Sequence, residues 1–205
     1  MREGYGTGKP MNVYRGDTAE ARRLQRRTRL IEAARRVFSE RGFHNATVRV
    51  VCEAAELTER YFYESFPNSE ALFIAMHKDT SERILREIAR AGGACGGSPE
   101  ERLRAMLTAY YEDILRDPGS AQLFAVDAAY ISPTAREVCA TWRQAYGLLL
   151  AQALGAGGAG NPIVRHAVIR ALLGIGVDWM EGGFAISTHE IVAAAMQVAK
   201  VLRDA

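Results

Sequence analysis

The residues best suited to form a binding surface lie in one short stretch, Thr58, Glu59, Arg60, Tyr61 and Tyr63. This set combines polar, charged and aromatic side chains on a segment too short to be a stable helix alone. An arginine at such a place binds either the major-groove edge of guanine, through two hydrogen bonds, or a phosphate. The pattern predicts a short recognition helix that neighbouring elements hold toward the major groove of DNA, as in a helix-turn-helix.

The segment just before it predicts the supporting helix. Thr47 and Thr58 are residue types that cap helix N-termini, and each precedes a helical stretch. Apolar contacts between the two helices are expected from Val48, Val51, Ala55 and Leu57, and Ala54 with Ala55 permits a close approach. Residues 47–72 therefore predict two short helices, a tight turn and the start of a third helix.

A basic helix is expected from about Thr18 to a C-terminal cap at Gly42, with Leu24 among its core-facing residues. Residues 1–49 hold 12 Lys and Arg against five Asp and Glu, a balance of +7, while the remainder of the chain carries −5. Such polarity fits phosphate binding with counterion release. It also fits a solvated basic helix face, and charge alone does not separate the two interpretations.

The whole chain predicts an all-α protein of about nine helices, because the apolar residues recur at helical spacing and no alternating strand pattern is present. We expect a flexible leader over 1–17, a helix-turn-helix domain over 18–67 and a connecting helix over 68–91. The glycine-rich stretch 92–97 is the clearest break. A larger helical domain is expected over 98–205, with helix starts at Ser98, Ser132, Asn161 and Ser187 and a short helix to about Tyr130.

Composition argues against several classes of protein. No apolar run is long enough to cross a bilayer, and the N-terminus lacks the apolar centre of a signal peptide. The three cysteines, Cys52, Cys95 and Cys139, are far apart, which favours a reducing cytoplasm over a disulfide framework. The four histidines have no metal-ligand spacing, and no serine or cysteine lies in a nucleophile motif. We therefore expect no enzyme activity, metal or cofactor.

One unbroken register of residues resembles the TetR family of bacterial transcriptional regulators. It runs from Thr28 to Phe73 and includes Ile31-Glu32-Ala33-Ala34, Phe38, Arg41-Gly42-Phe43, Thr47-Val48, Glu53-Ala54-Ala55, Leu57-Thr58, Phe62-Tyr63, Phe66 and Glu70-Ala71-Leu72. The match covers under a quarter of the chain but is far more specific than a generic helix-turn-helix.

The resemblance implies a set of DNA contacts, at Thr47, Arg49, Thr58, Glu59, Arg60, Tyr61, Tyr63, Asn68 and Ser69. Thr47 and Tyr63 match phosphate contacts, and Asn68 and Ser69 begin a helix whose free N–H groups can hold a phosphate. The sequence departs from the family pattern at Glu56, where the turn usually holds glycine, and at Ser69, where lysine is usual. A positive φ at Glu56 would carry strain.

The larger domain mixes aromatic and ionisable residues into apolar helices, at Tyr110, Tyr111, Phe124, Asp127, Tyr130, Trp142, Tyr146 and Trp179. Such residues line small-molecule cavities, but each also fits a plain core position. The resemblance implies an effector pocket among the helices between 98 and 181. Asp127 either pairs with an arginine such as Arg143 or Arg170, or faces a cationic ligand.

The final two helices, about 162–181 and 188–203, are apolar on more than one face, which predicts a four-helix interface between two copies of the chain. The resemblance implies the same two-fold dimer, and such a dimer predicts a near-palindromic operator. The leading hypothesis is a cytoplasmic, ligand-responsive, dimeric repressor that a small-molecule effector releases from double-stranded DNA. The alternative is an all-helical small-molecule-binding protein or enzyme without sequence-specific DNA binding.

Overall fold

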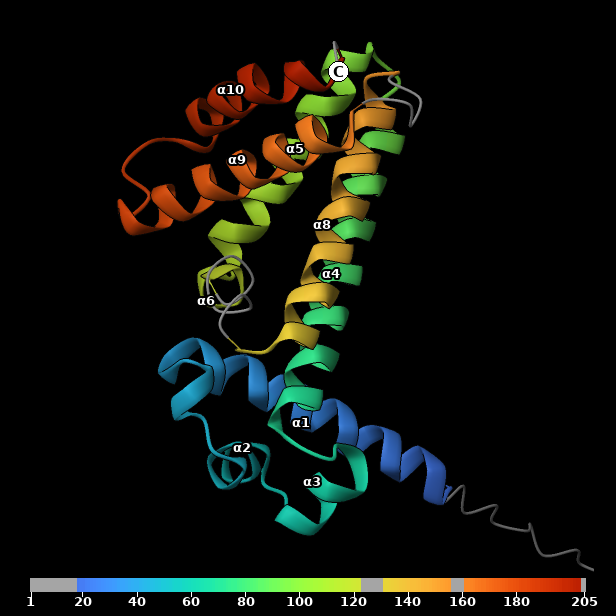
Figure 1. Ribbon diagram of the computed structural model, residues 1–205, viewed down its shortest axis with the longest axis vertical. Helices are drawn as coiled ribbons and strands as arrows, with labels where there is room; N and C mark the ends of the chain where they lie inside the picture. The colour runs from blue at the N-terminus through green and yellow to red at the C-terminus, as the bar shows by residue number, and fades with distance from the viewer. Residues whose placement is uncertain (1–17, 123–130, 156–160, 204–205) are drawn as a thin grey trace, which may run out of the picture.

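The computed structural model describes residues 18–122, 131–155 and 161–203, and its helices form two groups (Figure 1). Within these ranges the chain forms nine α-helices, two short 3-10 helices and no strand. The all-α fold class expected from the sequence is therefore confirmed. The predicted leader over 1–17 and the predicted helix ending near Tyr130 lie outside the described residues.

The smaller group, called the head here, consists of the first three helices and the start of the fourth. α1 (Ala19–Arg41) packs against α2 (Val48–Ala55) and α3 (Glu59–Ser65), and the 3-10 helix η1 (Phe43–Asn45) joins α1 to α2. The rings of Phe38, Phe43 and Phe73 meet in its core with centroids 5.5–6.2 Å apart. The buried head residues are Leu30, Ala33, Ala34, Val37, Phe38, Ala46, Val51, Cys52, Ala55, Phe62, Phe66, Leu72, Phe73 and Met76.

The larger group, called the body, is a bundle of longer helices. Its elements are α4 (Ser69–Ala94), α5 (Pro99–Arg116), α6 (Pro118–Gln122), α8 (Pro133–Ala153), α9 (Pro162–Glu181), α10 (Thr188–Ala199) and the 3-10 helix η3 (Lys200–Arg203). Its core includes Leu103, Tyr111, Leu172, Trp179 and Ala195. The buried carboxylate of Asp113 pairs with Arg83 and ties α5 to α4.

Side-chain caps fix the start of most helices, as the sequence predicts. Thr18, Thr47, Asn68, Ser98, Ser132, Asn161 and Ser187 each accept a hydrogen bond from a backbone N–H in the first helical turn. Thr58 occupies the N-cap position of α3, but its side chain forms no capping hydrogen bond. The start of α3 therefore depends more on tertiary packing than the start of α2 does.

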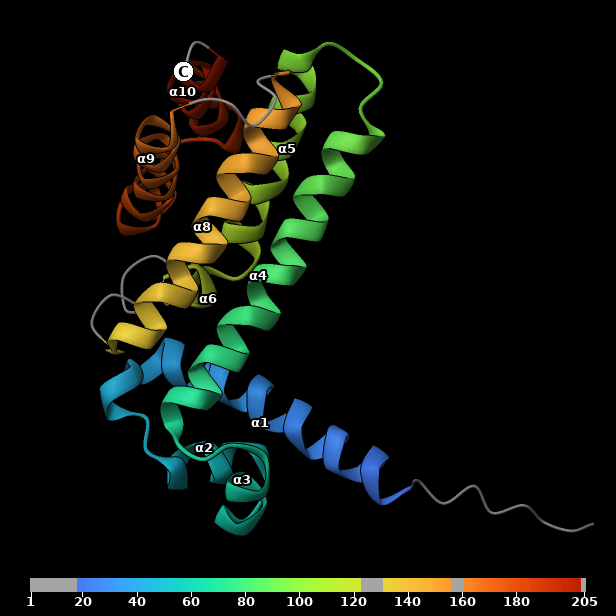
Figure 2. The same cartoon turned by 45° about the vertical axis from the view of Figure 1, so that its right-hand side comes forward.

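α4 extends through both groups and connects them (Figure 2). Its first turns contribute Leu72, Phe73 and Met76 to the head core, and its later turns contribute Ile84 and Ile88 to the body core. The N-terminal part of α8 makes a second connection, because Ala135 and Cys139 are buried in the head core. The Ser132 hydroxyl also donates to the Glu70 carboxylate at 2.5 Å.

The structure differs from the sequence-based expectation at the glycine-rich stretch 92–97. α4 continues through Gly92 and Gly93 to Ala94, where this stretch predicts a loop. Gly92 is buried against α5, so this glycine provides close helix packing rather than a helix end. Farther along the chain, Pro118 begins the short helix α6, because proline is well tolerated in a first helical turn.

Leu24, expected in the core, has 63% of its surface exposed. The first turns of α1 project beyond α2 and α3 (Figures 1 and 2), so no neighbouring helix covers this side chain.

Candidate functional site

The predicted recognition surface is exposed on α2 and α3. Thr58, Glu59, Arg60 and Tyr63 all lie in solvent on or beside α3, and 57% of the Tyr63 surface is accessible. Phe62, between them, is fully buried and anchors the helix in the head core. This division leaves one face of a seven-residue helix free to enter a groove.

The basic residues on this surface pair with acids of the same helix. Arg60 Nε donates to Glu64 at 3.2 Å, and Arg49 Nε on α2 donates to Glu53 at 2.9 Å. Both arginines are more than three-quarters exposed, so these pairs contribute little stability. Thr47 is exposed as well, but its hydroxyl already caps α2.

Glu56 forms the turn between α2 and α3 in the left-handed region, with φ 51° and ψ 45°. The positive φ anticipated for this position is therefore present in a residue with a Cβ. Its N–H bonds back to carbonyl oxygens of Cys52 and Glu53, which ends α2 sharply. The turn geometry that orients α3 is thus achieved at some cost in backbone strain.

Arginines of α1 hold α3 in place. The guanidinium carbon of Arg26 lies 4.3 Å from the ring centroid of Tyr61, and the same side chain lies 3.7 Å from Glu64. Arg27 covers the Phe66 ring at 4.2 Å and donates to the Ser65 carbonyl at 3.0 Å. Cation–π contacts and hydrogen bonds of this kind fix both the first and the last turn of α3.

A second pair of α1 arginines caps the C-terminus of α2. Arg29 donates to the Ala55 carbonyl at 2.7 Å, and Arg36 donates to the Ala54 carbonyl at 3.2 Å. Much of the positive charge of α1 therefore has a structural role. This is a third interpretation, beside phosphate binding and a solvated face, and a count of charges does not reveal it. The spacing of the arginines along α1 is visible in the sequence, but the carbonyl groups that they bind are known only from the fold.

Asn68 and Ser69 lie at the N-terminus of α4, beside α3. The Asn68 side-chain oxygen accepts from Ala71 N at 2.8 Å, so its cap is already filled. Tyr61 is half-buried under Arg26, whereas Tyr63 points outward. The structure thus brings all nine predicted DNA-contact residues to the α2–α3–α4 end of the head, with Tyr61 in a supporting position.

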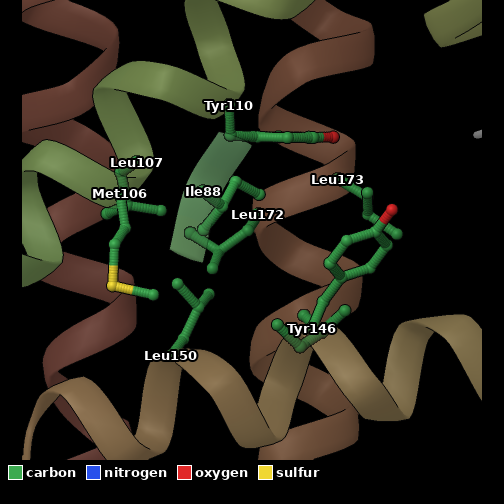
Figure 3. Close-up of a pocket in the computed structure, with 9 residues that line it drawn as sticks. Ile88, Met106, Leu107, Tyr110, Tyr146, Leu150, Leu172 and Leu173 are labelled. Carbon is green, nitrogen blue, oxygen red and sulfur yellow. The ribbon is translucent and has the colours of Figure 1, made fainter. Parts of the chain in front are cut away.

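An apolar cavity of about 30 Å³ lies inside the body, between α4, α5, α8 and α9 (Figure 3). It is lined by Ile88, Met106, Leu107, Tyr110, Tyr146, Leu150, Ile169, Leu172 and Leu173. Burial raises the pKa of Tyr110 and Tyr146 well above the usual tyrosine value, so both hydroxyls stay protonated and can donate. A cavity of this size needs side-chain movement before it admits anything larger than one or two water molecules.

Only part of the predicted ligand-binding set lines this cavity. Tyr110 and Tyr146 do, whereas Tyr111 is fully buried and donates to the Leu172 carbonyl at 2.9 Å. Trp179 packs on Tyr111 and donates to the Ile186 carbonyl, and Trp142 packs against the body core. Phe124, Asp127 and Tyr130 lie outside the described residues. The aliphatic lining from α4 and α9 was not predicted, because its members look like ordinary core residues of their helices.

Polar contacts between α4 and α8 lead from the cavity toward the head. The Tyr146 hydroxyl donates to the Ser81 carbonyl at 3.1 Å, and Ser81 Oγ lies 3.3 Å from His77 Nδ1. His77 Nε2 lies 3.1 Å from Cys139 Sγ, in the head core. A movement of Tyr146 would therefore act, through these contacts, on α4, the helix that connects body and head.

The ionisation of this pair is set by burial. Burial, together with the smaller effect of the nearby Arg143 charge, lowers the pKa of His77 to about 4. Burial also raises the pKa of the Cys139 thiol to about 11. At neutral pH the contact therefore joins a neutral imidazole to a protonated thiol, which is a structural arrangement rather than a reactive one.

Neither a metal centre nor a membrane span is evident in the part of the chain that the structure describes. No group of three or more His, Cys, Asp or Glu residues there could hold a metal ion. Among the same residues, no helix has the length and apolar character needed to cross a bilayer.

Comparison with known proteins finds relatives of the head. Residues 30–76 match the family described as "Bacterial regulatory proteins, tetR family". The chain is 39% identical over 59 residues to the HTH-type transcriptional regulator UidR of Escherichia coli K12, a match that covers 29% of this chain and 30% of that regulator. It is 30% identical over 82 residues to the HTH-type transcriptional repressor AcnR of Corynebacterium efficiens, covering 40% and 42% of the two chains. These curated relatives are thus matched over less than half of their length.

The fold extends the likeness beyond the head. The solved structure of the transcriptional regulator FadR from Bacillus subtilis, in complex with stearoyl-CoA, superposes with a TM-score of 0.71 at 16% identity. That match covers 85% of this chain and 96% of the other, so head and body share one architecture with it.

Proposed function

We propose that this chain, whose N-terminal domain belongs to the TetR family of bacterial regulatory proteins, is a dimeric repressor that a small-molecule effector releases from a near-palindromic operator. The observation that carries the proposal is the exposed face of α3, held from behind by Arg26, Arg27 and the buried Phe62. Several side chains on this face can read or contact DNA, and most of the arginine charge around it serves to position the helix. The proposal includes a cytoplasmic location and no enzymatic activity.

Residue roles in DNA binding follow from exposure. Arg60 and Tyr63 are proposed to reach the DNA, Arg60 at a base edge or phosphate and Tyr63 at a phosphate. Thr47, Arg49, Thr58, Glu59, Asn68 and Ser69 surround them as further contacts. Tyr61 is proposed to act through its stacking with Arg26 rather than by reaching deeply into the groove.

The effector is proposed to bind in the body cavity and to act through α4. Ile88 of α4 lines that cavity, and Asn68 and Ser69 at the other end of the connection are proposed DNA contacts. Tyr110 and Tyr146 are the predicted ligand residues at the cavity itself. A ligand can change DNA affinity only through a difference in its affinity for the two conformations of the protein.

The dimer is proposed to form through α9 and α10. Ile163 on α9 and Val201 near the chain end are 77% and 48% exposed, and Ala167, Ala171 and Ala194 are exposed as well. A Cβ built on Gly174 would meet nothing within 4 Å, so the outer face of α9 is open to a close helical neighbour. These features support a two-fold helical interface.

The test is a titration of the purified protein against DNA from immediately upstream of its own gene, with random duplex of equal length, at two salt concentrations. Arg60→Ala combined with Tyr63→Phe should lower affinity for the upstream DNA by tenfold or more, about 1–3 kcal/mol for a base contact, and reduce the preference over random duplex. Arg86→Ala removes an exposed charge from α4 of the body and serves as the control. Equal binding to both duplexes, followed by a random-library selection that enriches no sequence, would favour the small-molecule-binding alternative.

A further inference from the structure

We propose that the effector is an amphiphile, with an apolar chain in the body cavity and an anionic head at Arg102 outside it. The inference rests on the proposed function, because it assigns a ligand class to the same cavity. It also assigns the entrance, which is the side chain of Met106. The evidence is the geometry of two adjacent spaces, an enclosed one and an open one.

The enclosed space is suited to the apolar part of a ligand. Its lining is aliphatic and aromatic, and the polar atoms near it are the hydroxyls of Tyr110 and Tyr146. Within the part of the chain that the structure describes, no charged side chain contributes to the lining. In Figure 3, Met106 lies at one end of the cavity and Tyr146 at the other. A charged group inside would remain without a counterion, so the part of a ligand that enters should be apolar.

The open space lies next to the Met106 end. It is a cleft of about 360 Å³ at the top of α4 and α5, and its lining includes Gly92, Arg102 and Gln152. Met106 lines both spaces. A methionine side chain is unbranched and adaptable, so it can move aside with little strain. The two spaces would then form one continuous site.

Gly92 gives Met106 its present position. A Cβ placed on Gly92 would lie 2.8 Å from both Cγ and Sδ of Met106, closer than van der Waals contact allows. The adjacent Gly93 has nothing within 4 Å of the same position. Gly92 is therefore the residue that leaves room for the Met106 side chain at the entrance.

Arg102 supplies a cation at the mouth of the cleft. It forms no ion pair among the described residues, and its recorded contact is a long 3.5 Å hydrogen bond to the Gly97 carbonyl. The neighbouring acids are engaged elsewhere, since Glu101 accepts hydrogen bonds from Ser98 N and Oγ, and Glu100 pairs with Lys200. A guanidinium of this kind binds carboxylate or phosphate with two parallel hydrogen bonds. The class of ligand is therefore an acyl or alkyl chain that ends in an anion.

The probes are hexanoate, octanoate and decanoate, with octanol as the uncharged partner of octanoate, titrated calorimetrically into the full chain. Affinity should rise about fourfold for each methylene that enters the site once Met106 and the neighbouring side chains have moved aside. Arg102→Ala should weaken octanoate about tenfold and leave octanol unchanged. Arg104→Ala, an exposed arginine two residues away on α5, should change neither. Gly92→Ala should change the affinities for octanoate and octanol by the same factor, because its methyl group displaces Met106 at the entrance to the apolar part of the site.

Three results would overturn the inference. One is the absence of binding by all four probes, a second is equal affinity for octanoate and octanol, and a third is the same response from Arg102→Ala and Arg104→Ala. The operator titration is run in parallel on the unliganded protein. Operator preference without probe binding would reject the amphiphile and retain the proposed regulator. Probe binding without operator preference would retain the amphiphile and reject the proposed regulator.

Discussion

Replacing Glu56 with glycine should stabilise the protein, although the substitution removes an ion pair. The residue lies in the left-handed region, which costs a residue with a Cβ roughly 1–2 kcal/mol. Glycine avoids this strain, but its greater conformational freedom in the unfolded state lowers the stability of the folded protein by about 0.4–1 kcal/mol. The lost pair with Arg29, at 3.2 Å, is worth at most about 0.5 kcal/mol because 86% of the Glu56 side chain is exposed. The net expectation is a gain of about 0.5 kcal/mol.

Glu56→Ala separates strain from charge. It removes the same ion pair but keeps a Cβ in the left-handed region, so it should be neutral or destabilising by up to about 0.5 kcal/mol. Both variants retain the Arg29 bond to the Ala55 carbonyl. The measurement is urea unfolding at one fixed protein concentration, with the midpoints of wild type and both variants compared. A glycine variant no more stable than the alanine variant would refute the strain argument.

Two further predictions concern pH and assembly. The folded pKa of His77, about 4, is below its unfolded value near 6.5, so stability should fall as pH decreases through that window. Between pH 7 and pH 5, wild type should lose about 2 kcal/mol more than His77→Gln in urea unfolding, and parallel losses would contradict this. In sedimentation at micromolar concentration wild type should be dimeric, and Ala171→Glu should shift it toward monomer. Ala94→Glu, exposed on α4, should remain dimeric, and a monomeric wild type would exclude the α9–α10 interface.

Local chemistry determined much of the fold, and that part is readable from the sequence. Capping residues such as Thr47, Asn68 and Ser98 act on the first turn of their own helix, so their effect does not depend on distant partners. The left-handed turn at Glu56 follows from its place between two short helices. The register of the helix-turn-helix was therefore predictable residue by residue.

The features that sequence reasoning missed all depend on distant partners. Gly92 reads as a helix end until Met106 is placed beside it, and Leu24 reads as core until the projection of α1 is known. The basic charge of α1 fits phosphate binding or a solvated face until Tyr61 and Phe66 are found beneath Arg26 and Arg27. The cavity lining comes from four helices that are far apart in sequence, so its aliphatic members carry no local pattern.

Because α4 is continuous, a small rotation at the cavity produces a larger displacement at the N-terminal end of the helix. Ile88 and Ser69 are 19 residues apart in one unbroken helix, which corresponds to an arm of about 29 Å at 1.5 Å per residue. A rotation of about 5° around the cavity end would displace the other end by about 2.5 Å. That displacement approaches the length of a hydrogen bond. Angular amplification by a rigid arm would thus allow the proposed ligand to alter contacts that lie far from its own site.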